Sequence, residues 1–253
     1  MKNKLMFAIF VLMLAVSAFA QTEADFTVTL TSDSTGAVIT GYTGRTAQVR
    51  IPATIQGMPV REIGDSAFIN SSITSVVIPE GVTIIRRSAF YGCLDLASVT
   101  LPNTLTTIEN SVFHSCSKLS TINLPESLQI IGNNAFSYSG LTTITWPAGI
   151  TKIEYEVFRN CEKFHIITIP EGVTTIGNNT FSYCRALTSI TFPASINRIE
   201  GLAFQGCSNL TTVNIPESVE RIEFVGIDAF SDCPRLTLAS QAALRRVGYT
   251  AGF

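Results

Sequence analysis

The sequence predicts a repeat solenoid, in which short coils of about 23 residues stack on one another. Phenylalanines recur at intervals of 22 to 26 residues, and in each of the six middle repeats a proline stands 11 residues before the phenylalanine. A fixed period in this range indicates that each coil buries its apolar face only against its neighbours. The two series are Phe68, Phe90, Phe113, Phe136, Phe158, Phe181, Phe204 and Phe230, and Pro52, Pro79, Pro102, Pro125, Pro147, Pro170, Pro193 and Pro216.

Each repeat is expected to begin with a short parallel strand. In residues 187–192 (LTSITF) the last positions alternate polar and apolar, which is typical of a half-buried strand. Pro193 then ends the strand, because proline has no N–H with which to continue the ladder. The return segment, such as 218–222 (SVERI), has apolar residues three apart and leads to the phenylalanine that fills the interior.

The two ends of the array depart from the repeat and are predicted to form caps. A strand-like segment over 26–30 precedes the first repeat, and at the other end Ser240 is expected to cap a short helix over 241–247 that Gly248 ends. The predicted segments are a signal peptide over 1–20, an N-terminal cap over 21–44, a solenoid of about eight repeats over 45–236 and a C-terminal cap over 237–253.

Residues 1–20 have the layout of a cleavable secretory signal peptide. Two lysines precede an uncharged run over 5–16, and small residues lead to a cleavage site after Ala20. The run is shorter than the roughly 20 residues that cross a bilayer, and no later run is longer, so we expect no membrane span. The mature chain should begin at Gln21 and be secreted or held at the cell surface.

Acidic residues follow a two-coil rhythm. Stacking should place equivalent residues about 4.8 Å apart, so an acid in every second coil keeps like charges about 10 Å apart, near the Debye length. The segments that begin at Pro125 and Pro170 resemble each other more than their neighbours, which suggests duplication of a two-coil unit. The two acidic columns are Glu80, Asn103, Glu126, Ala148, Glu171, Ala194 and Glu217, and Glu109, Gly132, Glu154, Gly177 and Glu200.

The six cysteines all stand three residues after a repeat phenylalanine. Ser71 and Ser139 hold this position in two other coils, so a small buried residue is all that the position requires. Buried, inert thiols are one interpretation, and disulfides between stacked neighbours are the other, because the spacing of stacked Cα atoms permits them. The column comprises Cys93, Cys116, Cys161, Cys184, Cys207 and Cys233.

Composition and motifs point away from catalysis and from nucleic acid. The chain has a formal charge of −2 and only 14% charged residues, so the Coulombic attraction that dominates nucleic-acid binding is missing. His114 and His165 occupy different columns, and no spacing typical of zinc ligands occurs. We predict no catalytic residue, no metal and no cofactor, and interpret Trp146 as core filling.

One repeat reads Leu141-x-x-Ile144-x-Trp146-Pro147, followed by Ile153 and by Phe158 to Cys161. This pattern resembles the 23-residue Treponema pallidum-type leucine-rich repeat of BspA-like bacterial surface proteins, and the resemblance covers about residues 45–236. It implies a curved solenoid with a parallel sheet on the concave side and irregular, strand or turn return segments. It also implies a surface protein that attaches to host matrix proteins, to host cells or to other bacteria.

The outward positions of the predicted strands form the candidate ligand-binding concave face. They are rich in hydroxyl groups and nearly free of charge, which suits a preformed hydrogen-bonding platform for an extended protein or glycan. The simpler interpretation is that Ser and Thr merely suit a solvated strand. The positions are Gln48, Arg50, Ser75, Val77, Ser98, Thr100, Thr121, Asn123, Thr143, Thr145, Ile166, Thr168, Ser189, Thr191, Thr212 and Asn214.

We therefore predict a secreted or surface-associated protein that is not an enzyme and acts by non-catalytic adhesion to another protein. A structural or envelope scaffold that self-assembles is the alternative. A threonine array that faces ice or glycan is a third interpretation, which concave curvature disfavours because it spoils a flat lattice match.

Overall fold

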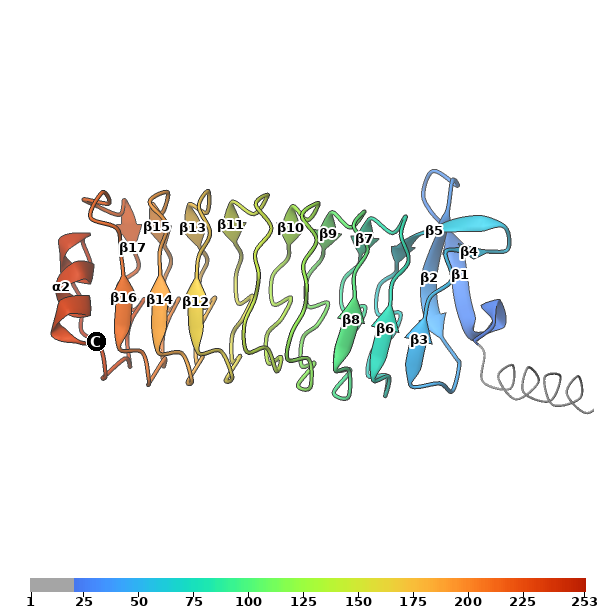
Figure 1. Cartoon of the computed structure of the whole chain (residues 1–253), viewed down its shortest axis with the longest axis horizontal. Helices are drawn as coiled ribbons and strands as arrows, with labels where there is room; N and C mark the ends of the chain where they lie inside the picture. The colour runs from blue at the N-terminus through green and yellow to red at the C-terminus, as the bar shows by residue number, and fades with distance from the viewer. Residues whose placement is uncertain (1–20) are drawn as a thin grey trace, which may run out of the picture.

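The structure, a computed structural model, describes residues 21–253; the predicted signal peptide lies outside this range. Two columns of short parallel strands run along the molecule, one in the leading segment of each coil and one in its return segment (Figure 1). This is the predicted parallel solenoid. The boundaries of the caps stay predictions. Within residues 21–253 no helix has the length and apolar character needed to cross a membrane.

The first column comprises two three-stranded parallel sheets. Each strand pairs in register with its equivalent in the next coil, as where Ile167 lies opposite Ile190. The strands are β3 (Gln48–Arg50), β6 (Ser75–Val77) and β8 (Ser98–Thr100), and β12 (Ile166–Thr168), β14 (Ser189–Thr191) and β16 (Thr212–Asn214).

The second column comprises the return segments, which mostly form strands of two residues. One sheet continues the N-terminal hairpin through β5 (Met58–Ile63), β7 (Ile84–Ile85), β9 (Thr107–Ile108) and β10 (Ile130–Ile131). The other contains β11 (Lys152–Ile153), β13 (Thr175–Ile176), β15 (Arg198–Ile199) and β17 (Phe224–Val225).

The phenylalanine series forms a continuous stack through the core. Neighbouring rings from Phe68 to Phe230 lie 4.9 to 5.6 Å apart between centroids, with planes within 16° of parallel. Trp146 and Phe164 pack edge-on against Phe158, at centroid distances of 5.5 and 5.4 Å. The half-buried Trp146 ring thus contributes to the core, as the sequence predicts.

The column of acids after the prolines has a role beyond charge spacing. The Glu80 carboxylate accepts a hydrogen bond from the backbone N–H of Asn103 at 3.0 Å, and the Glu126 carboxylate accepts one from Ala148 N–H at 3.2 Å. Each acid therefore satisfies a backbone donor on the next coil. The strand ends at the proline, so the N–H group of the residue after it lies outside the ladder. The glutamate of the preceding coil gives this N–H group a charged acceptor.

Both columns are interrupted near the middle of the solenoid. Between β8 and β12 the first column retains only an isolated bridge from Asn123 to Thr145, and β10 and β11 belong to different sheets (Figure 1). The turns that carry the phenylalanines stay bonded here, because Phe136 N–H donates to Val157 O at 2.9 Å. The two halves are thus joined mainly by the phenylalanine stack and its turns.

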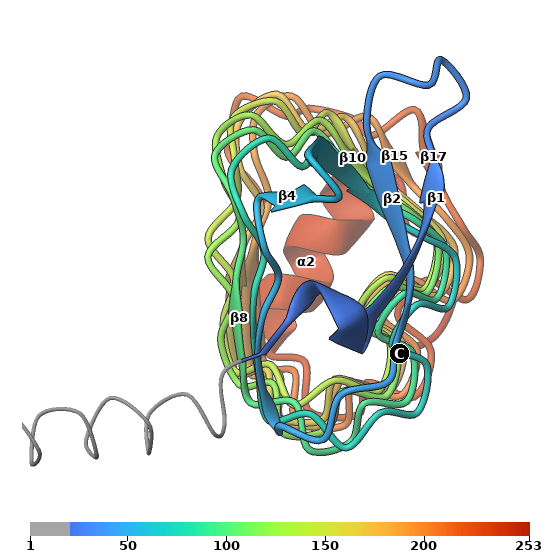
Figure 2. The same cartoon turned by 90° about the vertical axis from the view of Figure 1, so that its right-hand side faces the viewer.

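Short elements lie at the two ends of the solenoid, with the N-terminal hairpin towards the viewer in Figure 2. Aromatic rings pack against both ends of the phenylalanine stack. After the 3-10 turn η1 (Glu23–Asp25), the antiparallel strands β1 (Phe26–Leu30) and β2 (Ala37–Tyr42) form a hairpin whose Tyr42 ring lies 5.6 Å from that of Phe68. The short strand β4 (Thr54–Ile55) pairs with β5. At the other end Tyr249 packs edge-on against Phe230 at 5.5 Å.

The C-terminal helix α2 (Leu238–Arg246) begins earlier than the sequence suggests. Its N-cap is Thr237, whose hydroxyl accepts a hydrogen bond from Ser240 N–H, so the prediction that Ser240 is the cap is wrong. Ser240 is buried and instead docks the helix, because its hydroxyl accepts from Val213 N–H and donates to Thr211 O, both at 3.0 Å. Gly248 ends the helix with φ of 109°, as predicted.

Candidate functional site

The sixteen predicted face residues lie on the outer side of the first column, and all are exposed or half-buried. Twelve of them are in β3, β6, β8, β12, β14 and β16, where the residue between each outward pair points into the core. Thr121, Asn123, Thr143 and Thr145 lie on the same side but in the interrupted middle, outside regular strands. We call these sixteen residues the hydroxyl face.

Most hydroxyl groups of this face have no partner among the described residues. The side chains that do interact are few: Asn214 Nδ2 donates to Thr191 Oγ1 at 3.1 Å, and Thr212 Oγ1 lies 3.3 Å from Thr211 Oγ1. Arg50 is the one charged residue of the face. The face therefore presents unpaired neutral donors and acceptors on a rigid backbone.

A neighbouring threonine column, which the sequence reasoning missed, is structural. Thr188 Oγ1 donates to His165 O at 2.9 Å, and Thr211 Oγ1 donates to Thr188 O at 3.0 Å, each reaching the equivalent residue of the preceding coil. Thr142 Oγ1 reaches Ser120 O in the same way at 3.2 Å. The clue in the sequence is the threonine directly before the outward pair. These hydroxyls are occupied and do not belong to the face.

Shallow hollows lie at both ends of the hydroxyl face. One of about 620 Å³ is lined by Gln48, Arg50 and Val77 together with Pro52 and Pro79. Another, of about 370 Å³, is lined at the C-terminal end by Thr191, Asn214 and residues up to Glu217 and Ala243. Both are open to solvent, which suits contact with a large partner better than enclosure of a small molecule.

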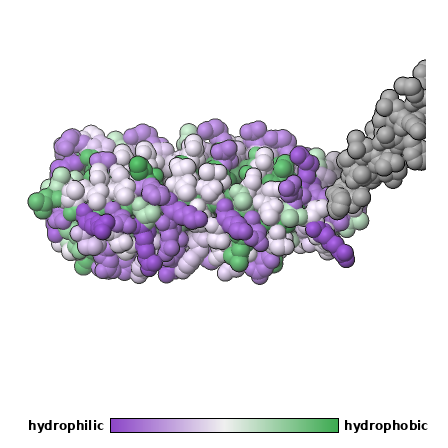
Figure 3. All heavy atoms as spheres, turned by 60° about the horizontal axis from the view of Figure 1, so that its bottom comes forward, coloured by the Kyte–Doolittle hydropathy of each residue, from purple (hydrophilic) through white to green (hydrophobic). Residues whose placement is uncertain are grey.

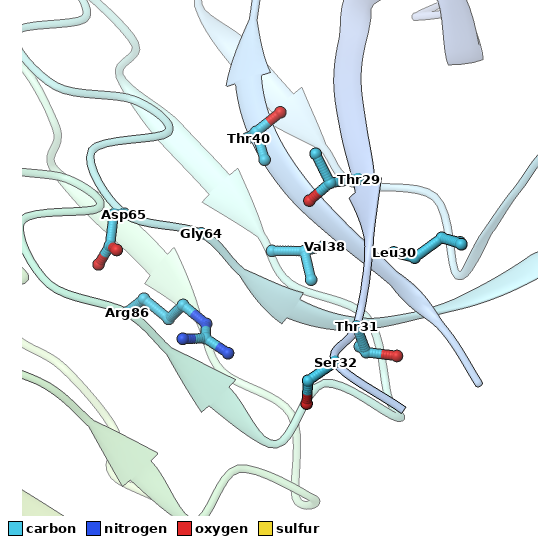
Figure 4. A pocket seen from close by; sticks show the side chains of 9 residues that line it. All are labelled: Thr29, Leu30, Thr31, Ser32, Val38, Thr40, Gly64, Asp65 and Arg86. Atoms are coloured by element: carbon cyan, nitrogen blue, oxygen red, sulfur yellow. The ribbon is translucent and has the colours of Figure 1, made fainter. Parts of the chain in front are cut away.

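A third hollow, of about 280 Å³, lies beside the N-terminal hairpin (Figure 4). Arg86 points into it, with Thr31 and Ser32 across from it and Asp65 nearby. The guanidinium is already bound, since Arg86 Nε pairs with the largely buried Glu62 carboxylate at 2.5 Å. With two acids close to a single arginine, this hollow has no excess positive charge to offer an anion.

The six cysteines are free thiols, and all are buried. Each Sγ donates to the backbone oxygen of the repeat phenylalanine in the preceding coil, at 3.0 to 3.3 Å. Ser139 completes the column, with its Oγ 3.3 Å from Cys161 Sγ. Of the two interpretations left open by the sequence, the structure has the buried thiols.

These thiols are expected to be unreactive in the folded protein. Burial raises the pKa of Cys93 to about 11 and that of Cys161 to about 12, so the reactive thiolate is scarce at neutral pH. At pH 8 iodoacetamide should modify none of the six in the native chain and all of them in guanidinium, as counted by intact mass. Disulfides would contradict this prediction, because fewer than six thiols would then react in guanidinium without reductant.

The same raised pKa values carry a pH dependence for stability. A thiol that is harder to ionise when folded supports the folded state fully below its unfolded pKa of about 9, and this support is lost as the pH rises toward about 12.

The two histidines do not meet. His165 is exposed, whereas His114 stacks on Tyr91 at 4.7 Å, and burial lowers the pKa of His114. Its Nδ1 lies 2.9 Å from Ser115 Oγ, a local contact between neighbours in sequence. Within residues 21–253 no three side chains of His, Cys, Asp or Glu form a group that could hold a metal ion.

One side of the molecule, seen in Figure 3, mixes hydrophilic and hydrophobic side chains along its whole length. The large exposed apolar residues are scattered over different elements, as with Ile166 at 62% and Leu238 at 83% exposure. Scattered residues of this kind do not make one apolar interface. The outward polar side chains along the rows of strands form a more continuous set than these apolar residues do.

Stacked 23-residue coils around a phenylalanine core define the class of leucine-rich repeat solenoids, which act through extended surfaces. A family model described as BspA type Leucine rich repeat region matches this chain with six copies, over residues 61–184 and 129–250. The chain belongs to this family of bacterial surface type. Solenoids of the family are generally non-catalytic and serve protein–protein interaction.

Solved structures of leucine-rich repeat proteins are similar to this chain. The T. pallidum leucine-rich repeat protein TpLRR is 30% identical, with a TM-score of 0.68 over 92% of this chain and 98% of that chain. A leucine-rich repeat protein from Eubacterium ventriosum, 20% identical with a TM-score of 0.59 over 80% of this chain and 51% of that chain, shares the fold. A comparison with curated proteins finds no match.

Proposed function

We propose that the protein is exported to the cell surface or beyond and binds another protein, without catalysis, through the hydroxyl face. The main support for this function is the row of unpaired hydroxyl groups on parallel strands that pair in register. Because these groups are fixed in place before a partner arrives, binding costs little conformational entropy. The partner proposed is a host matrix protein, a host-cell protein or a protein of another bacterium, and the layout of residues 1–20 supports export.

The chemistry of the face suggests a broad contact of modest affinity. Val77 and Ile166 add isolated apolar spots, and Ile166 is 62% exposed. The face carries no tryptophan or tyrosine and a single arginine, Arg50, and these are the residues that dominate tight interfaces. Affinity would come from many hydrogen bonds along several coils.

Self-assembly into a scaffold is the competing function. It is disfavoured because the strands at both ends of the first column are covered by other parts of the chain. Edge strands with free N–H and C=O groups promote strand-to-strand association. Here the Gln21 side chain donates to Gln48 O at 2.9 Å and accepts from Arg50 N–H at 2.6 Å, which occupies the edge of β3. Helix α2 lies against β16 at the other edge, where Ser240 binds Val213 N–H. Both edges of this column are thus blocked.

Four substitutions to glutamate, at Thr143, Thr145, Ser189 and Thr191, test this function. We expect binding to immobilised matrix proteins or to epithelial cells to weaken at least about tenfold, because the partner would have to desolvate new charges, and about 1.4 kcal/mol suffices for that factor. The thermal midpoint should stay close to that of the wild type, since all four side chains point outward. A folded wild-type protein that binds none of these surfaces would contradict the proposal, and one that also self-associates would favour the scaffold.

A further inference from the structure

A shortened turn opens a hollow in the middle of the solenoid, on the side of the phenylalanine turns. In the six coils with a cysteine, two residues separate that cysteine from the next strand's first apolar residue, but only Gly140 separates Ser139 from Leu141. Beside this turn lies a hollow of about 340 Å³, lined by Ser117 of one flanking turn and by Asn160, Glu162 and Lys163 of the other.

The tight path of this turn depends on Gly140. A Cβ atom at this position would overlap the backbone oxygen of Ser117, so any other residue would push the turn away from its neighbour. The hollow is therefore built by the local sequence rather than left by a loose loop. Ser139 and Gly140, which also line the hollow, are both buried.

An aromatic ring forms one wall of the hollow. Tyr138 is 45% exposed and lines the hollow. Its ring also lies 5.3 Å from that of His114, which in turn stacks on Tyr91. The three rings make a ridge along the turns, and Tyr138 stands at its end, next to the hollow.

Tyr183, the equivalent residue one two-coil unit later, shows how unusual this exposure is. A Cβ on Gly206 would lie 2.6 Å from the Tyr183 ring, so the ring rests directly on the Gly206 backbone. Arg185 also lies over it, 5.9 Å from its centroid. Tyr183 is therefore half-buried against its own chain, whereas Tyr138 is exposed and lines the hollow.

The polar groups of the hollow favour an uncharged ligand with several hydroxyl groups. Glu162 and Lys163 both line the hollow and carry opposite charges, so the lining side chains have no net charge. Carboxylate, ammonium and amide groups together offer both acceptors and donors to hydroxyls. A ligand with a net charge would meet no excess of opposite charge among the lining side chains.

We propose that this hollow binds one neutral pyranose unit of an oligosaccharide, with its C–H face stacked on Tyr138 and its hydroxyls bonded by Asn160, Glu162 and Lys163. The face of an aromatic ring is electron-rich, so it attracts the weakly positive C–H groups of a sugar ring. A volume of about 340 Å³ is near the lower end for ligand sites, which suits a single ring. The site lies on the turns and not on the hydroxyl face, so it stands independently of the function proposed above.

Saturation-transfer NMR of the purified protein with methyl β-D-glucopyranoside, lactose and N,N′-diacetylchitobiose tests this site. We expect transfer to the C–H protons of one ring face for at least one of these sugars. Tyr138→Ala should weaken binding about tenfold, the loss of about 1.4 kcal/mol that corresponds to one aromatic stacking contact. Tyr138→Phe, which keeps the ring, and Tyr183→Ala, which does not line the hollow, should bind as the wild type does.

Three results would overturn the proposal. One is equal saturation transfer in the wild type and in Tyr138→Ala, and another is no transfer to any of the three sugars at millimolar concentration. The third is preferential binding of a proline-rich peptide, whose rings could also stack on a tyrosine, in competition with the sugars. Because the adhesion assay substitutes none of the residues that line the hollow, failure here leaves that proposal untouched.

Discussion

Phe136→Ala is expected to lower the free energy of unfolding by about 3–5 kcal/mol, the usual cost of truncating a fully buried phenylalanine. The ring is inaccessible to solvent and lies between Phe113 and Phe158, at centroid distances of 5.5 and 5.6 Å. It also sits where both strand columns are interrupted, so its stack and its turn carry much of the contact between the halves. The loss would therefore weaken the one junction that has the least other support.

Urea unfolding monitored by circular dichroism measures this effect. Because a solenoid is stabilised by contacts between adjacent coils, the variant is also expected to unfold in two steps, one for each half. Ile130→Ala is the matched control, since Ile130 is 54% exposed and its loss should cost about 0.5 kcal/mol or less. A cost for Phe136→Ala as small as that of the control would contradict a core organised around the phenylalanine stack.

Gly177→Ala is the second substitution with a large expected cost, about 1–3 kcal/mol from overpacking. A Cβ at Gly177 would lie 2.7 Å from the backbone carbon of Glu154 and 2.9 Å from its oxygen, closer than packed atoms approach. Both atoms belong to the backbone of the preceding coil, so the coils would have to separate. The residue's own φ is not the reason, because it is not positive.

Gly201→Ala is the control for this prediction. There the nearest atom to a new Cβ is a side-chain nitrogen of Asn178, 3.3 Å away, which can move aside. We expect the thermal midpoint of Gly201→Ala to stay within a few degrees of the wild type and that of Gly177→Ala to fall clearly below it. Equal midpoints would show that the close approach of the two coils is not required.

The close contact at Gly177 is an example of what the sequence alone does not predict. The alternation of glutamate and glycine at positions such as Glu154 and Gly177 suggested that like charges are kept apart. This interpretation needs only the sequence, because the charged residues can be identified there. The backbone approach at Gly177 and the hydrogen bond that Ala148 N–H donates to Glu126 depend on the offset between coils, which periodicity does not specify. One acidic column thus has a steric constraint at Gly177 and the other a hydrogen bond at Glu126, and neither is visible in the sequence.

The repeat itself was predictable, because every coil must bury its apolar side chains against its neighbours and therefore carries the same pattern of residues. Strand, proline and phenylalanine recur in phase, so the order of elements and the buried stack follow from the period. The interruption around Thr145 and the capping role of Thr237 were not predictable, because both depend on how one particular coil meets its neighbour. The shortened turn at Ser139 is visible in the sequence, but the hollow beside it depends on side chains from three coils.

The hydroxyl face could be located from the period-2 alternation of the strands, but its use as a binding surface stays a proposal. The most direct test compares two variants in one binding assay on matrix proteins and epithelial cells. The first carries glutamate at Thr143, Thr145, Ser189 and Thr191 of the hydroxyl face. The second carries the same number of glutamates near the second column, at Thr107, Gln129, Thr175 and Asn197, which are also exposed or half-buried.

We expect the first variant to lose binding and the second to bind as the wild type does, with both remaining folded. Equal loss in the two variants would show that added negative charge, and not the hydroxyl face, governs the interaction. Loss in the second variant alone would place the binding surface on the return segments and contradict the central claim.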